Sequence, residues 1–288
     1  MPDGPKILIT GATDGIGHLA ALELARRGAH LILTARSEAK ANSTRAAIEM
    51  AAPGTSVDVR YVDFADLPAV VATGRAIAAQ HPRIDVLINN AGLHAFHQRI
   101  TKDGYAEMIA VNYFAPWLLT SILQETLVRS APSRVVTVAS EASRQSGGLN
   151  LEKDLFDAEP FTARGSSKIY GRTKLLDIMF SLELARRLEG AGVAVNCLCP
   201  GFNVTGLGRE LSFAGPLARV LKWLGIGNPE HGAGVIVRLA TAPEFGLQTG
   251  AYISVKNARP LTPVAPADSE EARRQLWDTT DKALSRFQ

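Results

Sequence analysis

The amino-acid sequence predicts a single α/β domain in which a doubly wound parallel sheet carries helices on both faces. Seven short runs rich in apolar and β-branched residues recur along the 288 residues. These runs are 6–10, 30–34, 57–62, 84–90, 134–140, 193–199 and 251–255. Stretches with helical periodicity lie between the first six, and this alternation indicates right-handed βαβ units. The runs are apolar rather than alternating, which is typical of strands buried on both faces.

The first connecting stretch shows the helical pattern most clearly. Its apolar stripe consists of Ile16, Leu19, Ala20 and Leu24. Gly28 then predicts the C-terminal end of this helix. No linker, low-complexity segment or internal repeat interrupts the chain, so we interpret residues 1–288 as one domain.

The C-terminal part, 257–288, is an extension of this domain. It is rich in Pro and Ala at first, and 268–287 then has a helical pattern. We expect Trp277, Ala283 and Leu284 to dock that helix onto the body of the protein.

Composition and charge exclude several classes of protein. The net charge is only +3 and the 31 basic residues are scattered, so a nucleic-acid binder is not expected. Cys197 and Cys199 are better interpreted as buried thiols than as metal ligands. No apolar run approaches the roughly 18 residues of a membrane span, and the N-terminus lacks the apolar region of a signal peptide. A soluble, cytoplasmic protein is expected.

A glycine-rich turn, "TGATDGIG" at 10–17, directly follows the first strand. Its glycines at 11, 15 and 17 lie between a predicted strand and a predicted helix. In that position, backbone N–H groups and the positive end of the helix can approach a pyrophosphate. The sequence therefore predicts a dinucleotide site.

The end of the second strand distinguishes the two nicotinamide dinucleotides. An acidic residue there would accept hydrogen bonds from the ribose hydroxyls of NAD. This sequence instead has Ala35 and Arg36, with no carboxylate before Glu38. A guanidinium can pair with a 2′-phosphate through its planar fork. We therefore expect NADP(H), the alternative being that Arg36 is only an exposed loop residue.

Five motifs in order carry a resemblance to a known family: "TGATDGIG" (10–17), "NNAG" (89–92), "VASEAS" (138–143), "YGRTK" (170–174) and "CPG" (199–201). On this α/β pattern, the sequence resembles the short-chain dehydrogenase/reductase family over nearly its whole length. The long interval from Ser140 to Tyr170 and the segments 228–240 and 250–278 look most like the retinol dehydrogenase branch. The resemblance implies a Rossmann-type sheet with strand order 3-2-1-4-5-6-7.

The resemblance also implies roles for individual residues. The catalytic residues would be Asn112, Ser140, Tyr170 and Lys174. The cofactor-binding residues would be Gly11, Thr13, Asp14, Gly15, Ile16, Gly17, Arg36, Asp63, Phe64, Asn89, Ala91, Gly92, Tyr170, Lys174, Pro200, Gly201 and Thr205. Within these sets, Asp63 would bind the adenine amine, and Asn112 would kink a helix and hold a water of the proton relay.

Tyr170 and Lys174 are one helical turn apart. An unperturbed tyrosine has a pKa of about 10 and is a poor base at neutral pH. An ammonium about 4 Å away, at an effective dielectric near 20, stabilises a phenolate by up to about 4 kcal/mol. That corresponds to up to about three pKa units. We expect Tyr170 to titrate near the operating pH, as proton-transfer catalysis favours, while Ser140 binds the substrate oxygen.

Three assignments stay open at this stage. Ser143 is an alternative to Ser140. His94 could border the substrate or be an ordinary loop residue, as could His97. The apolar segment 206–227 could be a substrate lid, a core helix or a peripheral membrane contact; its candidate substrate residues are Leu211, Phe213 and Leu217.

The expected function is NADPH-dependent reduction of an aldehyde or ketone on a lipophilic small molecule. One alternative is an NAD(P)-linked alcohol dehydrogenase working in the oxidative direction. Another is a non-catalytic NADP(H)-binding sensor or scaffold. The resemblance implies that a homodimer or homotetramer could form through helices near 114–129 and 170–188, although monomers also occur.

Overall fold

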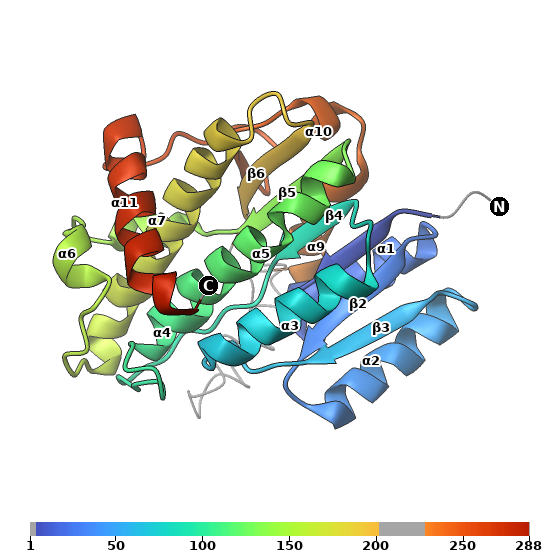
Figure 1. Ribbon diagram of the computed structural model, residues 1–288, viewed down its shortest axis with the longest axis horizontal. Coiled ribbons are helices and arrows are strands. Elements are labelled where there is room, and N and C mark those ends of the chain that lie inside the picture. Colours follow the sequence, from blue (N-terminus) through green and yellow to red (C-terminus); the bar gives the residue numbers. More distant parts are fainter. Residues whose placement is uncertain (1–3, 202–227, 288) are drawn as a thin grey trace.

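A seven-stranded parallel sheet forms the centre of the protein. The computed structural model describes residues 4–201 and 228–287 (Figure 1). The strand order is β3-β2-β1-β4-β5-β6-β7, and each strand runs parallel to its neighbours. The strands are β1 (Lys6–Ile9), β2 (His30–Ala35), β3 (Val57–Tyr61), β4 (Val86–Asn89), β5 (Ser133–Val138), β6 (Val193–Cys199) and β7 (Ala251–Ser254). The predicted fold class and strand order are confirmed.

Helices cover both faces of this sheet. One layer consists of α1 (Gly15–Arg26), α2 (Glu38–Ala51) and α9 (Pro229–Thr241). The other consists of α3 (Leu67–Gln80), α5 (Ala115–Arg129) and α7 (Ala163–Arg187). Shorter elements are α4 (Glu107–Ile109), α6 (Leu151–Asp154), α10 (Glu244–Leu247), a π-helical turn η1 (Ala110–Phe114), and two 3-10 turns, η2 (Glu141–Gln145) and η4 (Ser285–Phe287).

Three helices begin just beyond the carboxyl ends of strands, each at an oxygen-bearing cap residue. The side chains of Asp14, Ser37 and Asp66 accept hydrogen bonds from backbone N–H groups in the first turns of α1, α2 and α3, which satisfies donors that a helix leaves unpaired. Since the strands are parallel, these N-termini share one edge of the sheet. The strand order reverses between β1 and β4, and ligands of such sheets bind outside that point.

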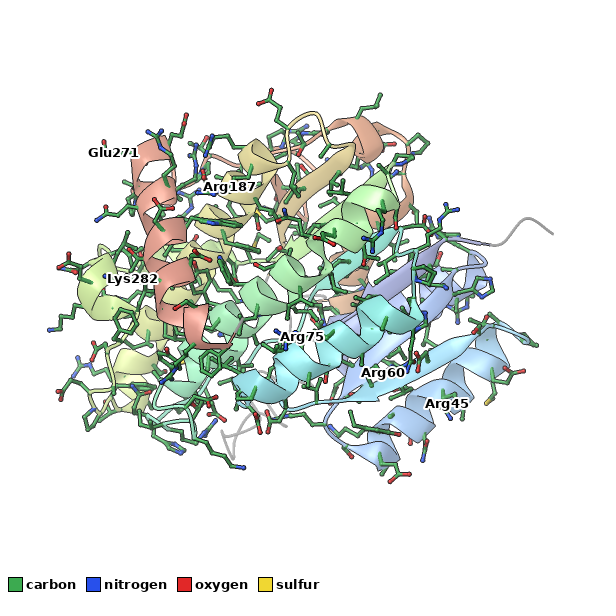
Figure 2. The ribbon with its side chains drawn as sticks, in the orientation of Figure 1. Arg45, Arg60, Arg75, Arg187, Glu271 and Lys282 are labelled. Atoms are coloured by element: carbon green, nitrogen blue, oxygen red, sulfur yellow. The ribbon has the colours of Figure 1, made fainter. Side chains whose placement is uncertain are left out.

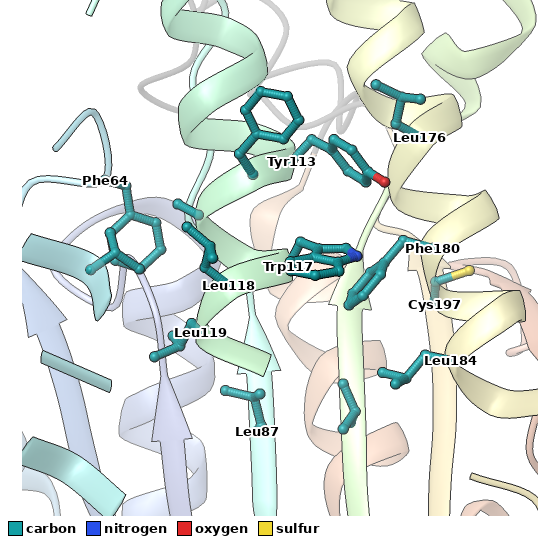
Figure 3. Packing of buried hydrophobic residues seen from close by; sticks show 14 of the residues in the cluster. Phe64, Leu87, Tyr113, Trp117, Leu118, Leu119, Leu176, Phe180, Leu184 and Cys197 are labelled. Atoms are coloured by element: carbon teal, nitrogen blue, oxygen red, sulfur yellow. The ribbon is translucent and has the colours of Figure 1, made fainter. Parts of the chain in front are cut away.

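The larger core cluster fills the space between the sheet and the layer containing α5 and α7. Figure 3 shows the indole of Trp117 on α5 facing the ring of Phe180 on α7, with Tyr113 above them. Trp117 is 1% exposed and Phe180 2%. Burial of such large rings contributes strongly to stability, so the helix that carries Tyr170 has a rigid support.

The C-terminal helix α11 (Glu270–Leu284) docks on α7 as expected. Trp277 stacks on Phe180 with ring centroids 5.9 Å apart and also lies 5.5 Å from Trp117. The guanidinium of Arg187, labelled in Figure 2, lies 4.4 Å from the centre of the Trp277 ring. Leu284 is fully buried. The expected anchoring by Trp277 and Leu284 is confirmed.

Basic side chains are spread over the surface. Figure 2 shows Arg45 on α2, Arg75 on α3 and Lys282 on α11, all exposed. Among the residues that the structure describes, no helix is long and apolar enough to cross a membrane. Within the same ranges, 4–201 and 228–287, no cluster of acidic, His and Cys side chains could hold a metal ion. Cys197 and Cys199 are free, buried thiols.

Candidate active site

The glycine turn between β1 and α1 lets two backbone segments approach closely. Gly11 has φ +67°, and a Cβ added there would lie 2.9 Å from Cα of Ala91. A Cβ at Gly17 would lie 2.7 Å from the carbonyl oxygen of Gly11 and would overlap the side chain of Asn90. Glycine is therefore required at both positions, and neither carries a side chain that would keep a pyrophosphate from the backbone at the start of α1.

Thr10 and Asn90 hold this turn in place, although neither was among the predicted site residues. The Asn90 amide donates to the carbonyl oxygens of Thr10 (2.8 Å) and Gly11 (3.1 Å). The Thr10 hydroxyl accepts from the backbone N–H groups of Asn90 and Ala91, both at 2.9 Å. In the sequence, Thr10 opens the motif "TGATDGIG", and Asn90 is the second asparagine of "NNAG".

Asp14 caps α1 and is also part of an ion pair. Its carboxylate accepts from the N–H of Gly15 at 2.8 Å and lies 3.0 Å from Nζ of Lys40 on α2. Thr13 and Ile16 are half-buried in the same turn. Lys40 was not predicted as a site residue, and its position becomes visible only once α1 and α2 are packed together.

Arg36 is exposed and lies directly between the end of β2 and the start of α2. Ser37 follows as the helix cap, and Lys40 lies in the first turn. Arg36 and the positive end of a helix thus occupy the place where an NAD enzyme would have a carboxylate, and the charge of Lys40 is paired with Asp14. This arrangement suits a 2′-phosphate.

Asp63 and Phe64 follow β3 and have different surroundings. Asp63 is exposed, and its Oδ1 accepts from the N–H of Ala65 at 3.0 Å. The Phe64 ring is 6% exposed and belongs to the core, so only its backbone is available to a ligand.

Two predicted residues, Asn89 at the carboxyl end of β4 and Gly92 just after it, have different surroundings. The side chain of Asn89 is 4% exposed and donates to Thr120 of α5 at 2.9 Å, so it stabilises the layer below. Gly92 is exposed, and a Cβ there would lie 3.4 Å from Oδ1 of Asn112 and 3.7 Å from Nζ of Lys174. The absence of a side chain at Gly92 keeps open the space above the lysine.

Asn112 lies in the π-helical turn η1, a distortion that is frequent at functional sites. Its side chain is 1% exposed. Oδ1 accepts from the N–H of Leu93 (2.8 Å), and Nδ2 donates to the carbonyl oxygen of Leu93 (2.9 Å) and to Thr173 (3.0 Å). Asn112 thereby joins the segment after β4 to α7. The π-helical turn lies where the kink was expected; the kink itself and the relay water remain predictions.

Ser140 lies at the end of β5, where the chain turns into η2. Its side chain is half-buried, and its Oγ accepts from the N–H of Ala142 at 3.1 Å, which leaves the hydroxyl hydrogen available to an oxygen. Ser143 is 1% exposed. The difference in access favours Ser140 as the residue that contacts substrate.

A glycine next to Tyr170 brings α7 and η2 together. A Cβ on Gly171 would overlap the carbonyl oxygen of Ala142 and lie 3.2 Å from the backbone nitrogen of Ser146. The long segment between Ser140 and Tyr170 therefore returns to the turn that contains Ser140. As predicted, the two residues lie on elements in direct contact.

Lys174 is buried and has two hydrogen-bond acceptors. Its Nζ donates to the carbonyl oxygen of Val138 at 3.0 Å and to Oδ2 of Asp177 at 2.8 Å. It lies 5.8 Å from the centre of the Tyr170 ring. An ammonium has three donors, so one remains for a ribose hydroxyl.

The pKa values in this group differ from the expectation for Tyr170. Burial raises the pKa of Tyr170; Lys174 lowers it and Asp177 raises it, with a net increase over the usual 10. Burial also raises the pKa of Asp177, and Lys174 counteracts it. For Lys174, burial lowers the pKa, but Asp177 and Tyr170 raise it more. The expectation that Tyr170 titrates near neutral pH is wrong: its desolvation and the carboxylate of Asp177 outweigh the ammonium.

His94 lies against the predicted acid. Its ring stacks on that of Tyr170 with centroids 4.6 Å apart and planes inclined by 15°. Its Nε2 lies 3.1 Å from Oγ of Ser166, near the start of α7. His94 therefore borders the site, whereas His97 is exposed.

Pro200 and Gly201 follow β6 at the same edge of the sheet. Gly201 has φ +75°, and a Cβ there would lie 2.9 Å from Cγ1 of Val255. Four other predicted residues, Thr205, Leu211, Phe213 and Leu217, lie outside the described residues, as does the segment 206–227.

The residues present fit a dinucleotide. The glycine turn lies at the start of α1, Gly92 leaves room above Lys174, and the exposed Arg36 supplies positive charge at the end of β2. These features lie at the carboxyl edge of the sheet, near the point where the strand order reverses.

Comparisons of the sequence agree with this geometry. The model of the short chain dehydrogenase family matches residues 5–150. Retinol dehydrogenase 14 from Homo sapiens is 37% identical over 294 residues, which cover 96% of this chain and 85% of that protein. Retinol dehydrogenase 13 from Homo sapiens is 33% identical, with 95% and 82% covered.

Known structures are similar over most of their length. The crystal structure of an uncharacterised protein from Mycobacterium paratuberculosis has a TM-score of 0.74 at 27% identity, covering 98% of this chain and 93% of that chain. A structure from Beutenbergia cavernae, described as an NAD(P)-dependent gluconate 5-dehydrogenase with bound NADP, has a TM-score of 0.68 at 28% identity, covering 88% and 96%. The chain therefore belongs to the short-chain dehydrogenase/reductase family of oxidoreductases and resembles its retinol dehydrogenases.

Proposed function

We propose that the protein uses NADPH to reduce an aldehyde or ketone on a lipophilic small molecule to the alcohol. The observation that carries this proposal is the pair of half-buried Tyr170 and buried Lys174, on a helix packed against the turn of Ser140. The similarity to retinol dehydrogenases supports a lipophilic substrate. Arg36 at the end of β2, and the NADP bound to the related structure, support the cofactor.

The residues of the site have distinct roles in this reaction. The glycine turn, Arg36 and Lys174 would hold the dinucleotide, which supplies the hydride when bound. Ser140 donates a hydrogen bond to the substrate oxygen and stabilises its developing negative charge. Tyr170 transfers its phenolic proton to that oxygen, and Lys174 stabilises the resulting phenolate.

The direct test is consumption of NADPH and of NADH with a panel of lipophilic aldehydes and ketones. We expect turnover with NADPH and little with NADH. The same protein is offered the corresponding alcohols with NADP⁺, so that an enzyme working mainly by oxidation is recognised. Tight NADPH binding without turnover in either direction would favour a sensor or scaffold.

Replacing Arg36 by Asp is expected to weaken the preference for NADPH. A charge-assisted hydrogen bond contributes about 1.5–3 kcal/mol, so the ratio of kcat/KM for NADPH to that for NADH should fall roughly 10–100-fold. Arg45→Asp makes the same charge change at an exposed position farther along α2 and serves as the control. An unchanged cofactor ratio in Arg36→Asp would contradict the assignment.

The C-terminal helix bears on the oligomeric state. α11 covers part of the outer surface of α7, where Trp277 packs on Phe180 and Trp117. The helices through which the resemblance implies pairing of subunits, near 114–129 and 170–188, contribute to that surface. We expect light scattering to give the mass of a single chain, and a stable dimer lost on mutation of exposed residues of α5 or α7 would contradict this.

A further inference from the structure

A buried carboxylate that the proposed reaction does not use lies beside the catalytic lysine. Asp177 is on α7, three residues beyond Lys174, and its Oδ2 lies 2.8 Å from the ammonium nitrogen. Asp177 is 2% exposed and Lys174 5%. A buried ion pair is expensive to desolvate and is weak evidence for a gain in stability, so another reason for it should be sought.

The groups facing this carboxylate provide little other compensation. Tyr113 reaches it from η1 and Cys197 from β6, and both are buried and neutral, because burial raises their pKa values far above the usual range. Oδ1 of Asp177 is buried without a hydrogen-bond partner among the described residues. Ser181 donates to the backbone oxygen of Asp177 and not to its carboxylate. Lys174 is therefore the cation that balances Asp177.

The ion pair of Lys174 and Asp177 also determines the electrostatic field at Tyr170. An ammonium alone would stabilise the phenolate strongly in a buried site. With Asp177 ionised, the two charges form a neutral pair, and their opposing effects on Tyr170 partly cancel. Tyr170 is also faced by His94, which stacks on its ring, and by the thiol of Cys199. The carboxylate of Asp177 is the anionic group in these surroundings.

We propose that Asp177 is a positioning residue that fixes the Lys174 ammonium and keeps the Tyr170 phenol protonated, so that the site donates a proton more readily than it accepts one. The inference rests on the proposed function in assigning Tyr170 as the proton donor. It adds a structural reason why Tyr170 is ready to protonate a carbonyl oxygen. One N–H of Lys174 stays available to the cofactor, since Val138 and Asp177 accept the other two.

The first test needs neither substrate nor cofactor. Ionisation of tyrosine is followed by ultraviolet absorbance, and subtracting the curve of the matching Tyr170→Phe protein isolates Tyr170. In the wild type, Tyr170 should remain protonated beyond pH 10, because its pKa is raised above 10. In Asp177→Asn, which keeps the shape but removes the charge, the midpoint should fall by at least about one pH unit. An unchanged or higher midpoint would overturn the proposal.

A matched control on the same helix is Glu183→Gln. Glu183 is fully buried and paired with Arg186 and Arg187, so the change removes a buried carboxylate without altering the pair at Lys174. The Tyr170 midpoint should not move. If Asp177→Asn does not fold, Asp177→Ser is the second neutral variant, with the same expected decrease, and Asp177→Glu, which keeps the charge, should leave the midpoint near that of the wild type.

Kinetics provide the second test. The rate of alcohol oxidation should rise with pH as Tyr170 ionises. In Asp177→Asn, this rise should shift to lower pH by as much as the Tyr170 midpoint falls. The ratio of the oxidation rate to the reduction rate at pH 8 should increase about tenfold or more. If Asp177 had only a structural role, Asp177→Asn would lower the oxidation and reduction rates together and leave the pH profile unchanged. That result would overturn the proposal. Absence of turnover in the wild type would count against the proposed function alone, because the absorbance titration does not depend on it.

Discussion

Replacing Tyr170 by Phe is expected to lower kcat/KM for carbonyl reduction by about 10²–10⁴-fold, the range typical of general acid catalysis. The phenylalanine ring can keep the stacking on His94, whose centroid lies 4.6 Å away, and the packing of α7. Only the hydroxyl is lost, so the variant lacks the proton that the substrate oxygen must receive. Steady-state kinetics with NADPH measure the effect.

Two further measurements make this result interpretable. Binding of NADPH, followed by its fluorescence, should be largely retained, because Tyr170 is one of many predicted cofactor residues, and the glycine turn, Arg36 and Lys174 are untouched. Thermal unfolding should also change little, since no packing is removed. A variant that keeps more than about a tenth of the wild-type kcat/KM would show that another group supplies the proton.

Gly171→Ala is expected to damage both stability and activity, although it adds a single methyl group. The new Cβ would overlap the carbonyl oxygen of Ala142, a backbone atom of η2. Overpacking of this kind costs about 1–3 kcal/mol. To relieve the overlap, α7 must move away from η2, and a displacement near 1 Å between Tyr170 and Ser140 is enough to lower kcat about 10²-fold. Urea unfolding and kinetics measure the two effects.

The control for this variant lies in the first turns of the same helix. A Cβ at Gly165 would meet only the side chain of Phe161, at an ordinary distance of 3.7 Å. Gly165→Ala should therefore stabilise the protein, by up to about 1 kcal/mol from helix propensity, and leave kcat nearly unchanged. Equal effects of the two substitutions would show that the close approach of α7 to η2 is not required.

The fold was predictable because hydrophobic patterning carries it. Seven apolar runs separated by helical stretches predict a parallel sheet, and all seven are strands in the structure. The ends were less accurate: 84–90 was expected, whereas β4 is Val86–Asn89. Ile84 is fully buried, but its N–H bonds to the Ser130 hydroxyl rather than to a neighbouring strand. The apolar character of a residue indicates that it is buried, but it does not indicate which acceptor its backbone N–H will bond to. The ends of strands therefore cannot be predicted from apolar runs alone.

The site was predictable where a local motif determines the path of the backbone. It was less predictable where side chains from different elements contact one another. Gly11 and Gly17 are needed for a close approach that the turn pattern already indicated. Asn90 and Lys40 were missed, because their partners lie on other elements. The predicted shift of the Tyr170 pKa was wrong in direction. Helix spacing identifies Lys174 as a neighbour of Tyr170, but it does not show how far the site is desolvated or that Asp177 lies beside the lysine.

The docking of α11 has a consequence for how the chain reaches its native state during synthesis. The hydroxyl of Tyr113, in the π-helical turn, is buried against Thr280 of α11, 167 residues further along the chain. All four catalytic residues leave the ribosome well before that partner exists. Until α11 arrives, the nascent domain exposes the aromatic surface around Phe180 and lacks one hydrogen bond in its interior, a state prone to association. Contacts of such long range slow folding, so the support of the catalytic helix is complete only after α11 has been made.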